Sequence, residues 1–302
     1  MSAFAHDRTS GAGDVALGFL AELERWLAID RSTSAPALRL GLLAWLKQAQ
    51  ASQPTMALVH QFAARALEVA DTALSRGETP AELRSALALS CAAERSDLSA
   101  ARRAVARQAA VLVTEAQRLD RDALDERHGA RRGAGSPAHR ARAARAGGRG
   151  PKPRLEGRAA AAALAEAGVP VWLVVDAALP LLLSQARMVW LGADAVTDQG
   201  VMNKLGSFAA ALAAREHSVP VYALAERRKF LPAATPALRI VEMPPEEVWE
   251  EPAAGVEPRN IYFERVPLPL LRGVVVEDAV LPPGETAALA RERPLPGELA
   301  GI

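Results

Sequence analysis

One segment without large apolar residues separates this 302-residue chain into two parts with different sequence patterns. Residues 126–154 contain no Val, Ile, Leu, Met, Phe, Tyr or Trp. Glu126 is the only acid in the segment, against nine basic residues: Arg127, Arg131, Arg132, Arg140, Arg142, Arg145, Arg149, Lys152 and Arg154. Such a composition buries too little apolar surface to offset the entropy lost on ordering the backbone. The sequence therefore predicts a basic Ala/Gly/Arg-rich linker over residues 125–154, between two folded parts.

Two other interpretations of the basic segment stay open. A nucleic-acid-binding arm would use its charge, but no aromatic residues are interleaved among the arginines, so nucleic acid is not the expected partner. Alternatively, the segment stands where a strand was lost, because it has the composition of GC-rich DNA translated in the wrong frame. Compensating insertions or deletions near codons 125 and 150 would show that the strand was lost through a change of reading frame.

Residues 1–124, before this segment, have the spacing of a helical domain. Apolar residues recur at helical intervals on two stripes, Val15, Phe19, Leu20, Leu23, Trp26, Leu27 and then Leu38, Leu42, Leu43, Trp45, Leu46. Residues 52–56 predict the start of a third helix, with Pro54 in its first turn. Thr79, Pro80 and Glu82 form the pattern of a capping box, and Gly77 suits the end of the preceding helix.

Residues 155–302, after the segment, alternate between strand-like and helix-like patterns. Helices are expected over 155–167, 178–185 and 205–215, and strands over 169–175, 189–191, 219–224, 238–243 and 272–277. Strands that alternate with helices predict parallel pairing through right-handed crossovers. We therefore expect a Rossmann-like α/β domain after a helical N-terminal domain, although no Gly-x-Gly-x-x-Gly motif supports a dinucleotide site.

The overall composition restricts the possible settings. Lys plus Arg number 36 and Asp plus Glu number 35, so no net field indicates a nucleic acid or membrane partner. Cys91 is the only cysteine, which excludes an intramolecular disulfide and a cysteine zinc cluster. The N-terminal residues lack the pattern of a signal peptide, and the most apolar run, residues 169–183, is too short to span a bilayer. We expect a soluble, cytoplasmic protein.

The stretch of residues 188–208, MVWLGADAVTDQGVMNKLGSF, is the strongest candidate for a site. A short apolar run ends at Asp194, and Asn203 and Lys204 are expected at or near the start of the next helix. Ligands of open α/β sheets bind at the carboxyl ends of the strands. A carboxylate, an amide and an ammonium at one such edge suit a small, polar, anionic ligand. The simpler alternatives are that Asp194 only caps a helix and that Lys204 is a solvated surface lysine.

Several motifs in the chain resemble one protein family. They are VVDAAL at 174–179, GADAVTDQGVMNKLGSF at 192–208, VPVYALAERRKF at 219–230, RNIYFERVP at 259–267, and, before the basic segment, DRTSGAGDVALGFL at 7–20 and SQPTMALVHQF at 52–62. In this order they look like the regulatory (alpha, beta and delta) subunits of eukaryotic translation initiation factor 2B. The same family includes ribose-1,5-bisphosphate isomerase and 5-methylthioribose-1-phosphate isomerase.

The resemblance implies a role for each matching residue. Asp194 corresponds to the aspartate that transfers protons in the isomerases, and Asn203 and Lys204 to the pair that holds the substrate's hydroxyls and phosphate. Arg8, Gly11 and Ala12 correspond to a loop and helix start that contact phosphate. Small residues at a helix N-terminus also expose backbone N–H groups to an anion, and an arginine adds a bidentate cation, although Arg8 could instead lie in a frayed terminus.

One feature of the isomerases is missing. The resemblance implies a catalytic cysteine on a strand within residues 125–150, where this chain has neither a cysteine nor an apolar run. Cys91 lies in a helical, alanine-rich pattern and matches no catalytic position. We therefore expect a protein that binds a phosphorylated sugar or a nucleotide and that isomerises an aldose 1-phosphate if it is active. The alternative is a non-catalytic regulatory subunit that acts through protein partners.

The resemblance also implies a homodimer or higher homo-oligomer, with no metal and no cofactor. The loop at residues 260–263 is expected to pack against a neighbouring subunit. Lys229 is expected in a solvated basic turn, and neither His60 nor His217 has metal-ligand partners at a suitable spacing.

Overall fold

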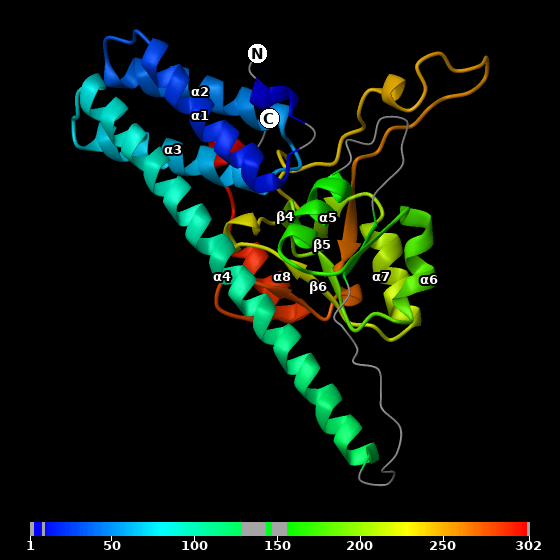
Figure 1. The fold of residues 1–302 in the computed structure, drawn as a ribbon. Coiled ribbons are helices and arrows are strands. Elements are labelled where there is room, and N and C mark those ends of the chain that lie inside the picture. Colours follow the sequence, from blue (N-terminus) through cyan, green and yellow to red (C-terminus); the bar gives the residue numbers. More distant parts are fainter. Residues whose placement is uncertain (1–2, 8–9, 129–142, 147–155, 301–302) are drawn as a thin grey trace.

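A helical part and an α/β part lie side by side in the computed structural model, which describes residues 3–7, 10–128, 143–146 and 156–300 (Figure 1). After a short 3-10 helix, Ala3–His6, four α-helices make up the helical part: α1 (Ala12–Ile29), α2 (Ala35–Ser52), α3 (Ala57–Ser75) and α4 (Pro80–His128). They enclose a core that includes Phe19, Leu38 and Leu58, all at most 2% exposed. The predicted helical character of this part is confirmed.

Local sequence signals fix several helix ends. The Thr79 hydroxyl accepts a hydrogen bond from the Glu82 N–H at 3.3 Å while the Glu82 carboxylate accepts one from the Thr79 N–H at 2.7 Å, which confirms the capping box. Gly77 follows α3 with a φ of +70°, as the helix-end prediction requires. The predicted start of the third helix is wrong by a turn, because α2 runs on to Ser52 and α3 begins only at Ala57.

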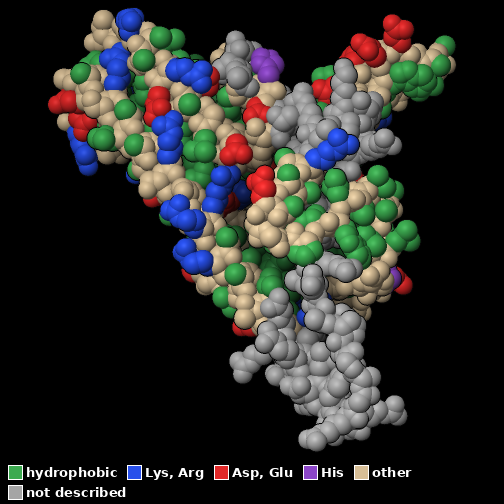
Figure 2. Space-filling model, viewed as in Figure 1, with side chains coloured by type: hydrophobic (Ala, Val, Ile, Leu, Met, Phe, Trp, Pro, Cys, Tyr) green, Lys and Arg blue, Asp and Glu red, His purple; other side chains and the backbone are tan. Residues whose placement is uncertain are grey.

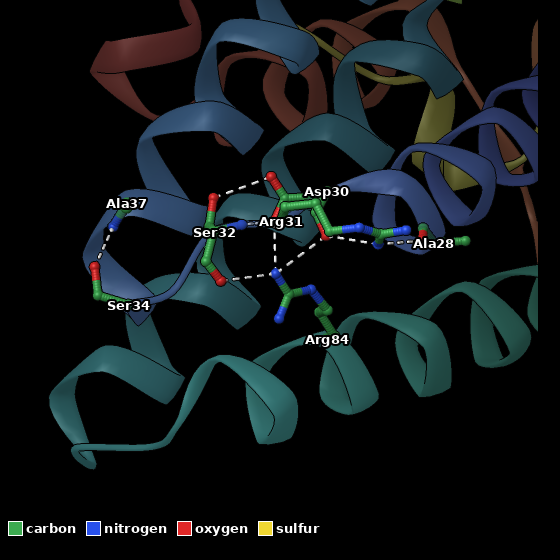
Figure 3. Close-up of polar contacts among 7 residues, drawn as sticks. All are labelled: Ala28, Asp30, Arg31, Ser32, Ser34, Ala37 and Arg84. Atoms are coloured by element: carbon green, nitrogen blue, oxygen red, sulfur yellow. Dashed lines mark hydrogen bonds and ion pairs between the residues drawn. The ribbon is translucent and has the colours of Figure 1, made fainter.

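The connection between α1 and α2 is tied to α4 by charge (Figure 3). The Asp30 carboxylate accepts hydrogen bonds from the Ser32 N–H at 3.0 Å and from the Arg84 guanidinium at 2.7 Å. Arg84 also donates to the Ser32 carbonyl, and the Ser34 hydroxyl caps α2 by accepting from the Ala37 N–H. Burial raises the pKa of Asp30, but the Arg84 and Ser32 hydrogen bonds outweigh it and hold the pKa below its usual value. One guanidinium therefore joins two consecutive helices to a third.

The α/β part is built on a four-stranded sheet in the order β3-β6-β8-β9. The strands β3 (Val189–Leu191), β6 (Val221–Leu224) and β8 (Gly273–Val275) are parallel, and β9 (Val280–Leu281) is antiparallel to β8. The helix α7 (Ser207–Glu216) lies between β3 and β6 in the sequence, and α8 (Pro283–Arg291) follows β9. The mostly parallel α/β character predicted from the alternating pattern is confirmed.

A second, antiparallel sheet was missed by the sequence analysis. It joins β4 (Ala195–Val196), β5 (Gly200–Lys204) and β7 (Phe263–Pro267). The residues 200–204, expected as a turn leading into a helix, form its central strand, because Val201 pairs with Val266 and both are fully buried. The Thr197 hydroxyl closes the β4–β5 turn by donating to the Gly200 carbonyl at 2.8 Å.

Short elements precede the main sheet. They are β1 (Ala143–Ala146), α5 (Glu156–Glu166), β2 (Val171–Val174) and α6 (Leu179–Leu183), and β1 pairs with β2 in parallel. A strand therefore does lie within residues 125–150, where none was expected. This strand consists only of alanine and arginine. It can form because a ladder of backbone hydrogen bonds does not require apolar side chains.

The region expected as a strand over 238–243 leads instead into an extended arm. Its only ladder contact in the described chain is an isolated bridge between Glu242 and Ile261. The arm, residues 244–262, projects from the body of the molecule and is drawn in orange at the upper right of Figure 1. Because prolines and glutamates dominate residues 244–252, the backbone there cannot complete a regular ladder.

The two parts are also connected beyond the basic segment. Phe263 of β7 and Leu299 of the last helix, α9 (Gly297–Ala300), belong to the helical core, and Arg39 of α2 forms an ion pair with Glu298 at 2.6 Å. The chain therefore returns to the helical part at its end. The subdivision at residues 124 and 155 remains a prediction. No helix in the described ranges combines the length and apolar character needed to cross a membrane.

Candidate functional site at the carboxyl edge of the sheet

Acidic residues follow the carboxyl ends of all three parallel strands. Asp194 lies three residues after β3, Glu226 two residues after β6 and Glu277 two residues after β8. Because β3, β6 and β8 are parallel, these ends meet at one edge of the sheet. This carboxyl edge is where open α/β sheets bind ligands.

The β4–β5 hairpin brings the Asp194 backbone to the strand that carries Asn203. Ala195 pairs with Met202 and Val196 with Val201. The Asp194 N–H donates to the Met202 carbonyl at 2.8 Å, so Asp194 lies beside the residue that precedes Asn203. The Asp194 side chain is buried, and a hairpin and not a helix start positions Asn203.

A hydrogen-bond relay holds the Asn203 amide. Its Nδ2 donates to the Ser207 hydroxyl at 2.9 Å, and this hydroxyl donates to the Lys204 carbonyl at 2.6 Å. A Cβ atom added to Gly192 would lie 3.3 Å from Asn203 Oδ1. The glycine at 192 therefore leaves room for the amide, and Oδ1 is the acceptor that faces the Gly192–Asp194 strand exit.

Lys204 lies in a different place from the other two predicted residues. Side chains alternate along a strand, so Lys204 projects to the opposite face of β5 from Asn203. Its ammonium lies 4.7 Å from the centroid of the Phe263 ring and 5.7 Å from that of Tyr262. The structure thus places Lys204 next to Asn203 in the chain but on the opposite face of β5.

Two helix N-termini approach this edge. The Ala57 N–H, at the start of α3, donates to the Asp194 carbonyl at 3.1 Å. Gln53, just before α3, donates through Nε2 to the carbonyls of Phe4 and Asp7, both at 2.9 Å, which ties the segment before α1 to the same turn. Positive helix ends close to a site favour an anionic ligand.

The predicted phosphate loop is described only in part. Gly11 is the N-cap of α1 with no side-chain cap bond, Ala12 is the buried first residue of the helix, and Arg8 lies outside the described residues. The Arg102 guanidinium of α4 lies against Gly13 and leaves no room for a Cβ there. Arg102 is also 3.6 Å from Glu226, so α1 and α4 meet at the carboxyl edge.

Glu226 and Lys229 form a buried ion pair that the sequence analysis did not assign to the site. The distance between Lys229 Nζ and Glu226 Oε2 is 2.7 Å, and both side chains are less than a tenth exposed. Burial raises the pKa of Glu226, but the attraction and hydrogen bond of Lys229 outweigh it and hold the pKa below its usual value. The expectation that Lys229 is solvated is wrong, because the turn after β6 folds under α3 and α4. A Glu-x-x-Lys spacing directly after a strand is the signal that could have indicated the pair.

Cys91 does not join this site. It is 2% exposed within the helical core, and burial raises the pKa of its thiol to about 11. A thiol with such a pKa is a poor nucleophile and a poor base at neutral pH. Among the residues that the structure describes, no group of three or more His, Cys, Asp or Glu side chains is arranged to hold a metal ion.

The fold defines a class of protein in which a helical part precedes an α/β part in the sequence. Acidic residues and an amide lie at the carboxyl edge of its parallel strands. Residues 139–283 match the model of the Initiation factor 2 subunit family. This region, just under half of the chain, is similar to that family, as the sequence resemblance predicted.

The relatives include two kinds of isomerase. The chain is 34% identical to ribose 1,5-bisphosphate isomerase of Methanocaldococcus jannaschii over 137 residues, 44% of each protein. It is 36% identical to methylthioribose-1-phosphate isomerase of Oleidesulfovibrio alaskensis over 152 residues, 46% of this chain and 42% of the relative. These matches cover less than half the length of either relative, so neither activity transfers to the whole chain.

Solved structures share the fold over nearly the whole chain. The translation initiation factor eIF-2B of Pyrococcus horikoshii OT3 superimposes with a TM-score of 0.69 and 21% identity, covering 93% of this chain and 94% of that one. A chain of the tetrameric eIF2B-beta2-delta2 complex of C. thermophilum superimposes with a TM-score of 0.62 and 15% identity, covering 95% and 90%. At these identities the likeness shows the fold, and one of the two relatives forms a hetero-oligomer.

Proposed function

We propose that this chain binds a phosphorylated sugar at the carboxyl edge of its parallel sheet. The observation that carries the proposal is that the Asn203 amide faces Gly192, at the strand exit that leads to the buried Asp194. A carboxylate accepts hydrogen bonds from sugar hydroxyls and an amide both donates and accepts them, so the pair suits a diol.

The phosphate is assigned to the N-terminus of α1. Gly11 and Ala12 offer backbone N–H groups that no side chain caps, and the helix dipole favours an anion there. Arg8 is the cation proposed to join them. Lys204 projects to the opposite face of β5, beside the Phe263 ring, so it is not assigned to this phosphate.

The reaction proposed for this ligand is the isomerisation of an aldose 1-phosphate to a ketose phosphate, with no metal and no cofactor. This reaction opens the ring and moves hydrogen from C2 to C1, which requires an acid and a base on either side of the sugar. Asp194 is the proposed base. The similarity to two sugar-phosphate isomerases supports the choice of substrate class.

A non-catalytic regulatory role is the second candidate, and Cys91 is the observation that favours it. The chain's only thiol is buried in the helical core with a raised pKa, so it does not supply the second proton-transfer group. In this role the same pocket senses a sugar phosphate or a nucleotide, and the protein acts through its partners.

We also propose that the chain forms a homo-oligomer in a cytoplasmic setting and that the arm takes part in the interface. Trp249, Val256 and Ile261 on the arm are 41–48% exposed, so the arm offers apolar surface that an interface would cover. The loop at residues 260–263, which the resemblance assigned to an interface, is available only in part, because Asn260 and Phe263 are buried within the chain itself.

Phosphorus NMR of the purified protein with ribose 1,5-bisphosphate and, separately, with 5-methylthioribose 1-phosphate tests the catalytic proposal. We expect conversion of one substrate and its loss in the Asp194→Asn variant. Phosphorus resonances that broaden without conversion would reject catalysis and support the sensor role. Sharp, unshifted resonances with both compounds would contradict the binding site itself.

A further inference from the structure

A cleft lies at the edge of the sheet opposite the proposed sugar-phosphate site. It has a volume of about 400 Å³ and its walls come from the end of α7, the start of β6 and the turn before β8. Leu270 is half-buried and supplies apolar surface, whereas Val219, Val221 and Leu271 are less than a tenth exposed and form the floor. Because β6 and β8 are parallel, this is their amino-terminal edge, away from Asp194 and Glu226.

Two arginines line this cleft and no acid does. They are Arg215, in the last turn of α7, and Arg272, just before β8. Within the described part of the chain, the guanidinium groups of both residues have no ion pair or hydrogen bond, whereas Arg39, Arg84, Arg95 and Arg227 all bind carboxylates. Arg215 is partly offset by the negative end of α7, so Arg272 supplies most of the available positive charge.

A strained serine faces the same cleft. Ser218 has a φ of +55° and is the only described non-glycine residue with a positive φ. It ends α7 in the position that Gly77 and Gly168 take after α3 and α5, with the Val219 N–H bonded to the Ala214 carbonyl at 2.8 Å. Left-handed backbone costs a residue with a Cβ about 1 kcal/mol or more. A serine at such a position, lining one cleft with two arginines, indicates a use for the hydroxyl.

A second cleft shares the central cation. It has a volume of about 580 Å³, is lined by Tyr222, Val280, Pro282 and Pro283, and has Leu271 and Arg272 in common with the first. Arg272 therefore stands between two apolar hollows. Volumes of this size fall in the range of small-molecule sites.

We propose that this amino-terminal edge binds a small amphipathic anion, a carboxylate or phosphate monoester on an apolar body. The anionic group bonds to Arg272, Arg215 and the Ser218 hydroxyl, and the apolar body lies against Leu270 or, in the second cleft, against Tyr222 and Val280. Charge-assisted hydrogen bonds to a guanidinium hold the head group, and burial of apolar surface holds the tail. The site is independent of the proposed sugar-phosphate site.

Isothermal titration calorimetry with matched probes tests the proposal. The probes are 3-phenylpropanoate, its neutral isostere 3-phenylpropanamide, phenyl phosphate and inorganic phosphate. We expect one of the two aromatic anions to bind at least about tenfold more tightly than the amide and than inorganic phosphate, since loss of a charge-assisted bond costs about one decade. The stronger of the two identifies the head group.

Variants locate the bound anion. Arg272→Gln is expected to weaken binding at least about tenfold, whereas Arg107→Gln, at an exposed arginine of α4, and Asp194→Asn are expected to leave it unchanged. Ser218→Gly relieves the left-handed strain, so it is expected to weaken binding while the protein becomes more stable, which separates loss of the site from loss of the fold. Equal affinity for the anion and the amide, retention of binding in Arg272→Gln, or no binding by any probe at millimolar concentration would each overturn the proposal.

Discussion

At the scale of single residues, burial decides the chemistry of several groups in this protein. Lys229 is hidden with Glu226 behind α4, Cys91 is hidden in the helical core, and His60 is fully buried. Gln50 Nε2 lies 3.0 Å from His60 Nδ1 and the Pro54 carbonyl 3.1 Å from His60 Nε2. With the proton on Nε2, the ring accepts from Gln50 and donates to Pro54, so the folded protein holds His60 neutral.

This neutral state gives His60 a defined effect on stability. Burial lowers the pKa of His60 from 6.5 to about 4, and only the Pro54 hydrogen bond opposes the shift. Below pH 6.5 the unfolded chain binds a proton at His60 that the folded chain does not. As the pH falls from 6.5 to 4, the free energy of unfolding should therefore decrease by about 1.4 kcal/mol per pH unit. Urea denaturation across this range in the wild type and in His60→Gln measures the effect.

The control for this measurement is His217→Gln, at an exposed histidine that ends α7. It should keep the wild-type dependence on pH, whereas His60→Gln should flatten it. Identical slopes for the wild type and His60→Gln would show that His60 titrates normally in the folded protein.

At the scale of elements, two helices end in a left-handed glycine, as expected, and one ends in a left-handed serine. Gly77 and Gly168 end α3 and α5 with positive φ, and Ser218 takes the same conformation after α7. Each end carries the same bond, from a backbone N–H just after the helix back to a carbonyl in its last turn, as in Val169 to Leu164.

Replacing this serine should therefore stabilise the protein. Ser218→Gly is expected to raise the free energy of unfolding by about 0.5–1 kcal/mol, because relief of the left-handed strain exceeds the entropy cost of glycine. The matched reverse change, Gly168→Ser, should lower it by a similar amount. Thermal or urea denaturation of both variants measures the difference, and a Ser218→Gly protein less stable than the wild type would refute the assignment.

The elements also show what the sequence could and could not predict. Residues 189–191 were predicted with correct bounds because an apolar run between turn signals is a local pattern, and so is the capping box of Thr79. The strand β5 was missed because its pairing with β7 joins Val201 to Val266, residues that no local pattern relates. The approach of Asn203 to the Gly192–Asp194 strand exit depends on that hairpin, so the sequence could name both residues but not how they meet.

At the scale of the whole molecule, two surfaces stand out from the body. Apolar side chains gather over α6 and α7, and acidic side chains gather on the arm (Figure 2). Leu181 of α6 and Phe208 of α7 are among the exposed large apolar residues. The arm includes Glu246, Glu247, Glu250, Glu251 and Glu257. An arm that combines this charge with exposed Trp249 is the proposed oligomer contact.

The arm can be tested through the mass of the protein in solution. Trp249→Glu should shift the sedimenting species from a dimer or larger assembly to the 31.9 kDa of one chain, because it places a charge in an apolar contact. Leu181→Glu, at a side chain that is 77% exposed on α6, is the matched control and should leave the mass unchanged. A wild-type protein that sediments as a single chain, or a Trp249→Glu protein with wild-type mass, would contradict the proposal.

Binding at the strand exit that Asp194 and Asn203 line is the central claim, and calorimetry of ribose 1,5-bisphosphate measures it most directly. Asn203→Asp adds a second carboxylate at this exit, which should repel an anionic ligand and lower its affinity at least about tenfold. Gln199→Ala, in the turn of the β4–β5 hairpin, should bind as the wild type does. Wild-type affinity in Asn203→Asp would contradict the account, and loss of binding in that variant alone would place the sugar at this exit.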